Sequence, residues 1–238
     1  MEVNSKKVVM ISGANRGIGF AIVQKLLSEG YIISAGVRIP EELPLELASV
    51  KEDQLLCQKY DARNYPTAET WIKATVNKFG KIDALINNAG ILHTNGLEEE
   101  AEDLLDDMWE VNAKGPLRLT RLAFPYLRKS GSGRIIDIIS MSGKRVKGDW
   151  VGYSMSKYAA YAVSQTARLQ GWEDGIRVTS ICPGFVQTGM ATQNAPHFPQ
   201  EKMSQPEDVA NLVSTLLLLS NESAVPELMI NCVFETLN

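Results

Sequence analysis

The sequence is poor in the residues on which several common kinds of chemistry depend. Its 238 residues include only three cysteines, Cys57, Cys182 and Cys232, and no Cys-x-x-Cys pair. Cysteines that are odd in number and far apart argue against a disulfide framework or a zinc site, and they suit a reducing compartment. Two histidines, His93 and His197, leave little material for Cys–His, Ser–His or polyhistidine chemistry. We therefore expect a functional site without metal.

Long apolar runs and strong charge are also missing. The most apolar stretch, LVSTLLLLS, is far too short to cross a bilayer. The polar start, MEVNSKK, does not have the pattern of a signal peptide. A net charge of −4 gives no reason to expect affinity for nucleic acid. The sequence thus predicts a cytoplasmic protein whose partner is a small molecule, with neither nucleic acid nor membrane.

Apolar strands alternate with amphipathic helices along the whole chain. Strands are predicted at residues 7–12, 31–37, 54–60, 82–87, 133–140, 176–182 and 227–232. Helices are predicted at residues 17–29, 66–79, 98–110, 113–129, 151–173 and 206–220. Because the strands are apolar on both faces, the pattern predicts a seven-stranded parallel sheet with helices on each side. No linker divides residues 1–238, so we expect a single α/β domain of the doubly wound, or Rossmann, class.

A cluster of glycines follows the first predicted strand, where open parallel sheets bind their ligands. Residues 12–19 read SGANRGIG. Glycines in a strand-to-helix turn let a pyrophosphate approach the backbone, and the start of the next helix offers it N–H groups. The spacing is G-x-x-x-G-x-G, which differs from the G-x-G-x-x-G fingerprint. The position still predicts a dinucleotide site, with Gly13, Asn15, Arg16, Gly17, Ile18 and Gly19 as candidate residues.

The end of the second predicted strand indicates which dinucleotide binds. Sites for NAD often carry a carboxylate there, but this strand ends in Val37 and Arg38. Together with Arg16 of the glycine turn, Arg38 can clamp a 2′-phosphate. A hydrogen bond to a charged group contributes roughly 1.5–3 kcal/mol, which corresponds to about ten- to hundredfold in affinity. NADP is therefore the predicted cofactor, although Arg38 could also be a solvated loop residue.

The stretch YSMSK, residues 153–157, places a tyrosine and a lysine four positions apart. On a helix, Tyr153 and Lys157 would lie on one face. A phenol titrates near pKa ~10, and a neighbouring ammonium lowers that pKa by favouring the phenolate. The pair can thus form a tuned acid and base. Taken alone, it is more typical of a solvated helix, so its meaning depends on the motifs around it.

Taken in order, these motifs resemble the short-chain dehydrogenase/reductase family over nearly the whole chain. SGANRGIG is similar to the cofactor turn of the family, NNAG (87–90) to its second signature and YSMSK to its Y-x-x-x-K. Asn112, Ser140 and PGFVQT (183–188) also stand at positions that match the family. The resemblance implies hydride transfer between NADP(H) and a ketone or secondary alcohol. It also implies homodimers or homotetramers.

The resemblance implies catalytic roles for four residues. Tyr153 would donate a proton to the alkoxide, while Lys157 would lower the pKa of Tyr153 and hold the nicotinamide ribose. Ser140 would hydrogen-bond the carbonyl oxygen, and Asn112 would support a water chain that returns the proton. Without the resemblance, Ser140 is better explained as a strand-end cap, and Asn112 is plausible as a helix cap.

Further residues follow from the resemblance, although ordinary packing could explain them as well. Asp61 would accept a hydrogen bond from the adenine amino group, with Ala62 beside it, and Val111 would touch the adenine pocket. The other cofactor residues are Asn88, Ala89 and Gly90 near the adenosine, and Pro183, Gly184, Val186 and Thr188 near the nicotinamide. The substrate residues are Ser140, Ser142, Trp150, Tyr153 and Phe185, with His93, Met141 and Met190 as additional candidate walls.

Two features differ from the common pattern of the family. The end of the chain, INCVFETLN, lacks an Asp-Gly-Gly, which removes the sequence basis for subunit contacts through the tail. The segment after Thr188 is short, which predicts a compact or open-sided pocket. Within the helix predicted at 151–173, YAAYAV (158–163) is apolar on more than one side and predicts contact with a partner subunit.

The sequence supports one main hypothesis and three alternatives. The main one is an NADPH-dependent carbonyl reductase, reversible as an alcohol dehydrogenase; Trp150 and Phe185 suggest an apolar or aromatic substrate. The second is a reductase of 3-oxoacyl thioesters, in which the basic stretch KRVK (144–147) meets a phosphate-bearing carrier arm instead of forming a solvated loop. The presence of Tyr153 and Lys157 argues against a non-catalytic NADP(H) sensor. The short chain argues against a nucleotide-sugar epimerase.

Overall fold

The computed structural model describes residues 6–146 and 148–233, and its strands form one parallel sheet. The sheet has seven strands in the order β3-β2-β1-β4-β5-β6-β7. They are β1 (Val8–Ser12), β2 (Ile32–Val37), β3 (Leu55–Lys59), β4 (Ala84–Asn87), β5 (Arg134–Ile138), β6 (Arg177–Pro183) and β7 (Glu227–Ile230). The order reverses between β1 and β4, the kind of crevice in which doubly wound sheets bind ligands. The predicted fold class is confirmed.

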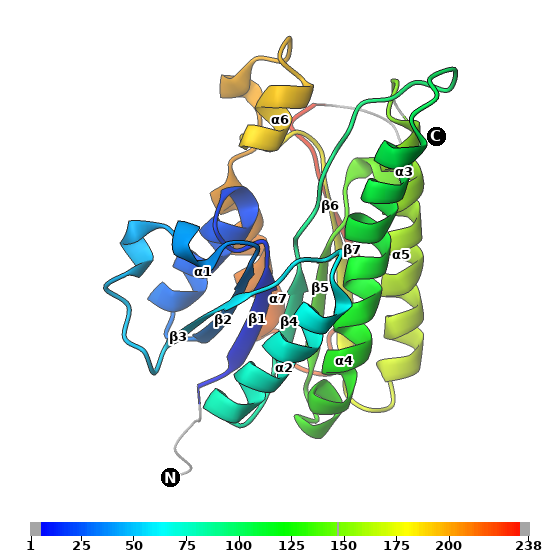
Figure 1. Cartoon of the computed structure of the whole chain (residues 1–238). Coiled ribbons are helices and arrows are strands. Elements are labelled where there is room, and N and C mark those ends of the chain that lie inside the picture. The colour runs from blue at the N-terminus through cyan, green and yellow to red at the C-terminus, as the bar shows by residue number, and fades with distance from the viewer. Residues whose placement is uncertain (1–5, 147, 234–238) are drawn as a thin grey trace.

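Helices cover both faces of the sheet (Figure 1). Helices α1 (Gly17–Ser28) and α7 (Pro206–Leu218) pack on one face. Helices α2 (Tyr65–Phe79), α4 (Gly115–Lys129) and α5 (Val151–Gly171) pack on the other. Two shorter helices, α3 (Glu102–Met108) and α6 (Gly189–Asn194), lie toward the end of the molecule where the strands finish (Figure 1).

The sheet divides the hydrophobic core into two layers. One layer joins Ile22 and Val213 to the sheet, and the other contains Trp71 and Leu119. Trp71 packs directly against the backbone of Gly36 in β2, where an added Cβ would stand 2.5 Å from the indole ring. Burial on both faces explains why the strands are almost continuously apolar in sequence.

The region of the third and fourth predicted helices differs from the prediction. Instead of two helices separated near residue 111, α3 continues through a π-helical turn, η3 (Trp109–Lys114), into α4. The π turn contains Asn112, whose side chain bonds the backbone outside the helix. Single π turns inside helices are frequent at functional sites. The prediction of separate helices was wrong. The partner of Asn112 is the backbone of Ile91, 21 residues away, and local periodicity does not reveal it.

Smaller differences from the prediction appear after β5 and β6. β5 ends at Ile138 rather than at residue 140, so Ser140 follows the strand and begins the short helix η4 (Met141–Gly143). The helix α6 was not predicted. Lys147 of the basic stretch and residues 234–238 of the tail lie outside the described residues. Among the helices of the described chain, none has the length and apolarity needed to cross a membrane.

Candidate functional site

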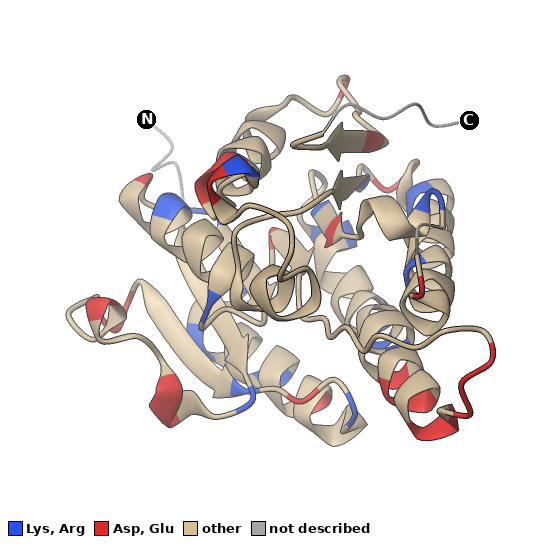
Figure 2. Cartoon of the chain, turned by 90° about the horizontal axis from the view of Figure 1, so that it is seen from above, with Lys and Arg blue, Asp and Glu red and all other residues tan. Residues whose placement is uncertain are grey.

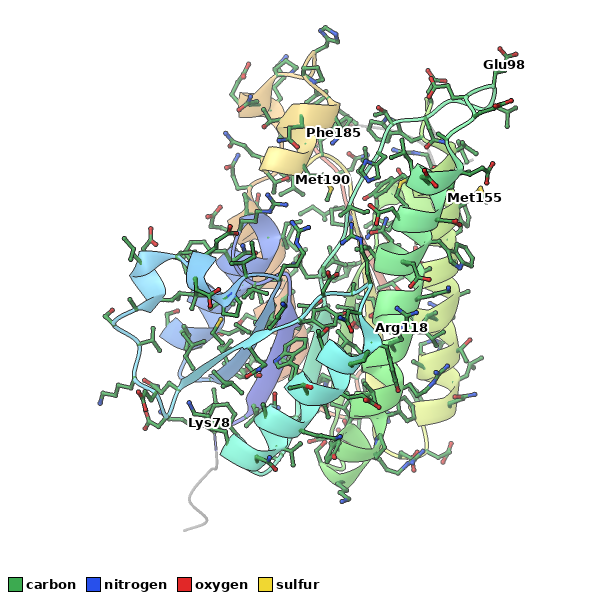
Figure 3. All side chains as sticks on the ribbon, viewed as in Figure 1. Lys78, Glu98, Arg118, Met155, Phe185 and Met190 are labelled. Carbon is green, nitrogen blue, oxygen red and sulfur yellow. The ribbon has the colours of Figure 1, made fainter. Side chains whose placement is uncertain are left out.

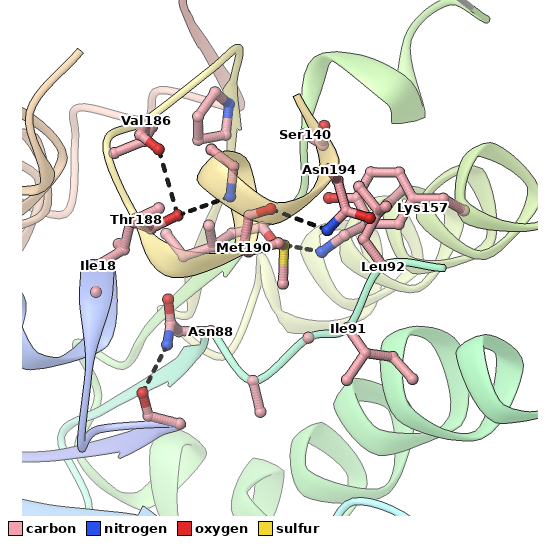
Figure 4. A pocket seen from close by; sticks show the side chains of 18 of the residues that line it. Ile18, Asn88, Ile91, Leu92, Ser140, Lys157, Val186, Thr188, Met190 and Asn194 are labelled. Atoms are coloured by element: carbon pink, nitrogen blue, oxygen red, sulfur yellow. Dashed lines mark hydrogen bonds between the residues drawn. The ribbon is translucent and has the colours of Figure 1, made fainter. Parts of the chain in front are cut away.

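A cavity of about 650 Å³ opens at the carboxyl ends of the strands, and Figure 4 shows part of its wall. The predicted cofactor and substrate residues line this cavity, with the exception of Gly19. His93, Met141 and Met190 line it as well. Asn112, predicted as catalytic, does not reach its surface. The structure thus brings to one place side chains that are spread over most of the sequence.

The glycine turn between β1 and α1 has the shape that a close backbone approach requires. Gly13 and Gly17 have positive φ angles of 67° and 54°, which favour glycine strongly. At Gly19, an added Cβ would stand 2.2 Å from the carbonyl oxygen of Gly13. Gly19 therefore sets the conformation of the turn without forming the cavity surface itself.

Ser12 was not predicted, yet it joins the glycine turn to the NNAG loop. The Ser12 hydroxyl accepts hydrogen bonds from the backbone N–H groups of Asn88 and Ala89, both at 3.0 Å. In return, the Asn88 amide donates to the carbonyl oxygens of Ser12 (2.9 Å) and Gly13 (3.1 Å; Figure 4). These bonds connect the ends of β1 and β4, so the two loops form one continuous wall.

Two arginines present positive charge to the cavity, one from the glycine turn after β1 and one just after β2. Arg16 and Arg38 both line it, and within the described part of the chain neither lies within 4.0 Å of a carboxylate. Val37 is buried, so the last residue of the strand offers no carboxylate to a ribose. Glu42 also contributes to this part of the wall. The residues fit a ligand that carries a phosphate beside its ribose, as NADP does.

Tyr153 and Ser140 meet on the cavity wall. Both side chains line the cavity, and Tyr153 is 7% exposed. Burial raises the pKa of Tyr153 to about 12, and the hydrogen bond with Ser140 opposes that rise. The predicted lowering of this pKa by Lys157 is therefore not found: burial raises the pKa instead. A phenol in this state keeps its proton at neutral pH and is equipped to donate it. Ser140 also caps η4, since its hydroxyl accepts from the backbone of Ser142 at 3.0 Å.

Lys157 lies one helical turn beyond Tyr153 and is 6% exposed. Its Nζ atom donates to the carbonyl oxygen of Ile138 at 3.0 Å and lies 5.8 Å from the centroid of the Tyr153 ring. Burial lowers the pKa of Lys157 to about 8, while Cys182 and Asp137 oppose that change. Lys157 therefore brings a cation beside Tyr153 at neutral pH.

Asn112 acts from behind the cavity wall. Its Oδ1 atom accepts from the N–H of Ile91 at 2.9 Å, and its Nδ2 atom donates to the Ile91 carbonyl at 2.8 Å. Nδ2 also donates at 3.0 Å to Ser156, whose hydroxyl in turn donates to the Tyr153 carbonyl at 2.8 Å. Asn112 lies within η3, so the alternative as a helix cap is wrong. It connects the loop after β4 to the helix of Tyr153, through a serine that the sequence did not single out.

Aromatic side chains form the outer wall. Trp150 makes edge-to-face contacts with Tyr153, at 6.4 Å between ring centroids, and with Phe185, at 6.1 Å. Phe185 also packs on Phe198 at 4.8 Å, a contact that was not predicted. Between residues 187 and 202, around α6, every residue is at least partly exposed.

The basic stretch at residues 144–147 does not face the cavity as a unit. Lys144 bonds Glu227 at 2.9 Å and lies over the ring of Tyr161 at 4.1 Å. Lys144 does not line the cavity, whereas Arg145 does. Lys147 is outside the described residues. Of the three basic residues predicted to form an anion site, the structure therefore places only Arg145 on the cavity.

An ion cluster that was not predicted stands at the rim. Asp107 accepts from Arg63 Nη2 at 2.9 Å, and it lies 3.1 Å from His93 Nε2. The hydrogen bond from Arg63, followed by that of His93, holds the pKa of Asp107 below its usual range. Arg63 and His93 both line the cavity. The cluster connects the cavity wall to α3, and acidic residues are numerous on this helix and just before it (Figure 2).

Comparisons with known proteins agree with this geometry. Residues 7–198 match the family model of the short chain dehydrogenases. Agropine synthesis reductase from Rhizobium rhizogenes is 38% identical over 100% of this chain, which spans 55% of that relative's length. An alcohol dehydrogenase from Thermococcus sibiricus, complexed with 5-hydroxy-NADP, superimposes with a TM-score of 0.88 at 30% identity, over 97% of this chain and 98% of that one. A variant of actinorhodin polyketide ketoreductase with NADPH has a TM-score of 0.87 at 28% identity, over 97% of each chain.

Proposed function

This chain belongs to the short-chain dehydrogenase family, and we propose that it is an NADPH-dependent carbonyl reductase that also acts in reverse as an alcohol dehydrogenase. One observation carries the proposal. Ser140 and Tyr153 lie on the same cavity as the glycine turn and as Arg16 and Arg38, neither of which has a carboxylate within 4.0 Å among the described residues. A proton donor and a nucleotide cradle on one cavity are what carbonyl reduction requires.

The residues present fit NADP. Gly13 and Gly17 let a pyrophosphate reach the backbone, Arg16 and Arg38 would hold the 2′-phosphate, and Lys157 would hold the nicotinamide ribose. The related structures with NADPH and 5-hydroxy-NADP support this choice of cofactor. When bound, NADPH supplies the hydride that reduces a carbonyl carbon.

The protein's own residues supply the proton that the substrate oxygen receives. The Ser140 hydroxyl donates a hydrogen bond to the substrate oxygen and orients it beside Tyr153. Tyr153 Oη transfers its proton to that oxygen as the alcohol forms, and the Lys157 ammonium stabilises the phenolate that remains. Asn112 holds the loop after β4 through Ile91 and the helix of Tyr153 through Ser156, and so keeps both in position.

The walls favour an apolar or aromatic carbonyl substrate. Trp150 and Phe185 offer ring faces and edges next to Tyr153. Arg145 on the cavity favours the second candidate, a reductase of 3-oxoacyl thioesters. Two features speak against that candidate: Lys144 is bonded to Glu227, and the acidic segment 98–107 adjoins the rim through Asp107 and would repel a phosphate-bearing arm (Figure 2).

A substrate panel tests the proposal. The purified chain is mixed with NADPH and with aliphatic ketones, aryl ketones or 3-oxoacyl thioesters, and the loss of NADPH absorbance is followed. We expect the aryl ketones to react fastest. Faster reaction of the thioesters, abolished by charge reversal at Arg145, would establish the second candidate instead. Tight NADPH binding without turnover of any carbonyl would indicate a non-catalytic sensor.

We also propose that α5 forms a subunit interface. In the single chain, Met155 and Tyr158 of α5 are 54% and 43% exposed, and Trp109 of η3 is 42% exposed. Figure 3 shows Met155 on α5 near the outer edge of the molecule. A two-fold contact through this face would bury these side chains in a closed dimer. Light scattering of the purified protein, with Met155→Glu as the disrupting variant, measures the subunit number.

A further inference from the structure

A cluster of polar side chains is buried between the sheet and helices α4 and α5. Its members come from five elements and are each 6% exposed or less: Asn87, Thr120, Asp137, Ser164 and Ser180. Asn87 Nδ2 donates to Asp137 at 2.7 Å and to Thr120 at 3.1 Å. The Ser164 hydroxyl accepts from the Ser180 hydroxyl at 2.8 Å, and it acts on the Asp137 carboxyl by lowering its pKa. A carboxyl group in an otherwise apolar layer is costly, and the proton transfer described above does not use it.

The surroundings of Asp137 are arranged for an ionised carboxylate. The Asn87 amide reaches Asp137 with its N–H group. Ser180 can donate to Ser164, which leaves the Ser164 proton for Asp137. An ionised carboxylate only accepts hydrogen bonds, so a set of donors suits it. Burial raises the pKa of Asp137, while these hydrogen bonds and the charge of Lys157 oppose that rise.

Lys157 needs a counter-charge that its immediate contacts do not supply. Its Nζ atom donates to the carbonyl of Ile138, and no carboxylate among the described residues lies within 4.0 Å of it. The titratable groups that act on it are Cys182 from β6 and Asp137 from β5, with Tyr153 on its own helix. Cys182 and Tyr153 are neutral at pH 7, because burial raises their pKa values to about 11 and about 12.

We propose that Asp137 is a positioning residue of this site: a buried carboxylate that serves as the counter-charge of Lys157 and keeps its ammonium protonated beside Tyr153. The proposal rests on the proposed function, since the charge on Lys157 serves proton transfer. Opposite charges in a poorly hydrated interior favour each other's ionised forms. Loss of the charge at residue 137 therefore lowers the pKa of Lys157 further and shortens the pH range in which the lysine assists Tyr153.

The test compares two variants that disturb the same cluster. Asp137→Asn removes the charge and keeps the shape, whereas Thr120→Val removes a hydrogen bond and no charge. Lysine is labelled with ¹³C at Cε, and the Lys157 resonance is assigned by its absence from Lys157→Met. We expect the titration midpoint of Lys157 to fall by at least about half a pH unit in Asp137→Asn, or roughly threefold in the protonation constant. In Thr120→Val we expect no change.

The same comparison has a kinetic readout. The alkaline limb of kcat/KM for carbonyl reduction should move to lower pH in Asp137→Asn and stay in place in Thr120→Val. Equal movement in both variants, or in neither, overturns the proposal. If Asp137→Asn does not fold, the ¹³Cγ resonance of Asp137 in the unmodified protein decides: a protonated carboxyl at pH 7 overturns the proposal. The resonance titrations need no turnover, so they stand even if the substrate panel contradicts the proposed function.

Discussion

The floor and the outer wall of the cavity are built in opposite ways. We call floor the part of the cavity formed by the glycine turn, Asn88, Ser140, Tyr153 and Lys157. Asn88 and Lys157 bond backbone atoms at the ends of β1 and β5, and Asn112 bonds the loop after β4 from behind, over distances of 2.8–3.1 Å. On the outer wall, Phe185 packs on Trp150 and Phe198, and no residue of segment 187–202 is fully buried. Groups held by many directed bonds are in place before a ligand arrives, which suits catalysis. Apolar contacts are less directional and suit the selection of a substrate. We therefore expect floor variants to change the rate of the chemical step, and wall variants to change substrate preference.

The largest effect is expected from Tyr153→Phe, on the floor. The variant keeps the ring against Trp150 and removes the proton donor. Carbonyl reduction should fall by about 10²–10⁴-fold, the usual contribution of a positioned acid. The dissociation constant of NADPH, measured by fluorescence titration, should change little. Retained turnover would remove Tyr153 from its proposed role, and loss of NADPH binding would show that the ring holds the cofactor instead.

A smaller effect, confined to the cofactor, is expected from Arg38→Ala. NADPH should bind about ten- to hundredfold more weakly, because a charge-assisted hydrogen bond to its 2′-phosphate is lost. The affinity for NADH should stay as it is. Lys144→Ala is the matched control: it also removes a cation near the cavity, but one already bonded to Glu227. An equal loss of both cofactors would contradict the assignment of Arg38 to the phosphate.

Most residues of the floor could be predicted from the sequence, because they directly follow strands or belong to motifs with a defined spacing. In a parallel sheet the carboxyl ends of the strands meet at one edge, so the positions of Gly13, Asn88 and Ser140 could be predicted together. What was missed depends on distant partners. Ser12 bonds the backbone of Asn88, 76 residues away, only because β1 and β4 are neighbours.

Two other features show the same limit. Ser156 is defined by Asn112, 44 residues away in a π turn that local periodicity does not reveal. In the predicted cationic patch at 144–147, Lys144 is bonded instead to Glu227, which lies 83 residues further along the chain. In each case the chemistry of the residue was visible in the sequence, but its partner depended on strand order and helix packing. The outer wall was hardest to predict, because aromatic residues fill cores and pockets alike.

The smallest effect is expected on the outer wall, from Phe185→Leu. The variant keeps an apolar side chain on the cavity and removes the ring contacts with Trp150 and Phe198. An aryl ketone would also lose its own contact with the Phe185 ring. Aromatic pairs contribute about 0.5–1.5 kcal/mol beyond simple burial, so KM for aryl ketones should rise by about two- to tenfold. The kcat value should change little, since Tyr153 and Ser140 are left in place. Phe198→Leu is the matched control, because it removes the ring pair between Phe185 and Phe198 while leaving Phe185 on the cavity. If Phe185→Leu lowers kcat for small aliphatic ketones as strongly as for aryl ketones, the wall takes part in positioning the reacting groups, and the division between floor and wall is wrong.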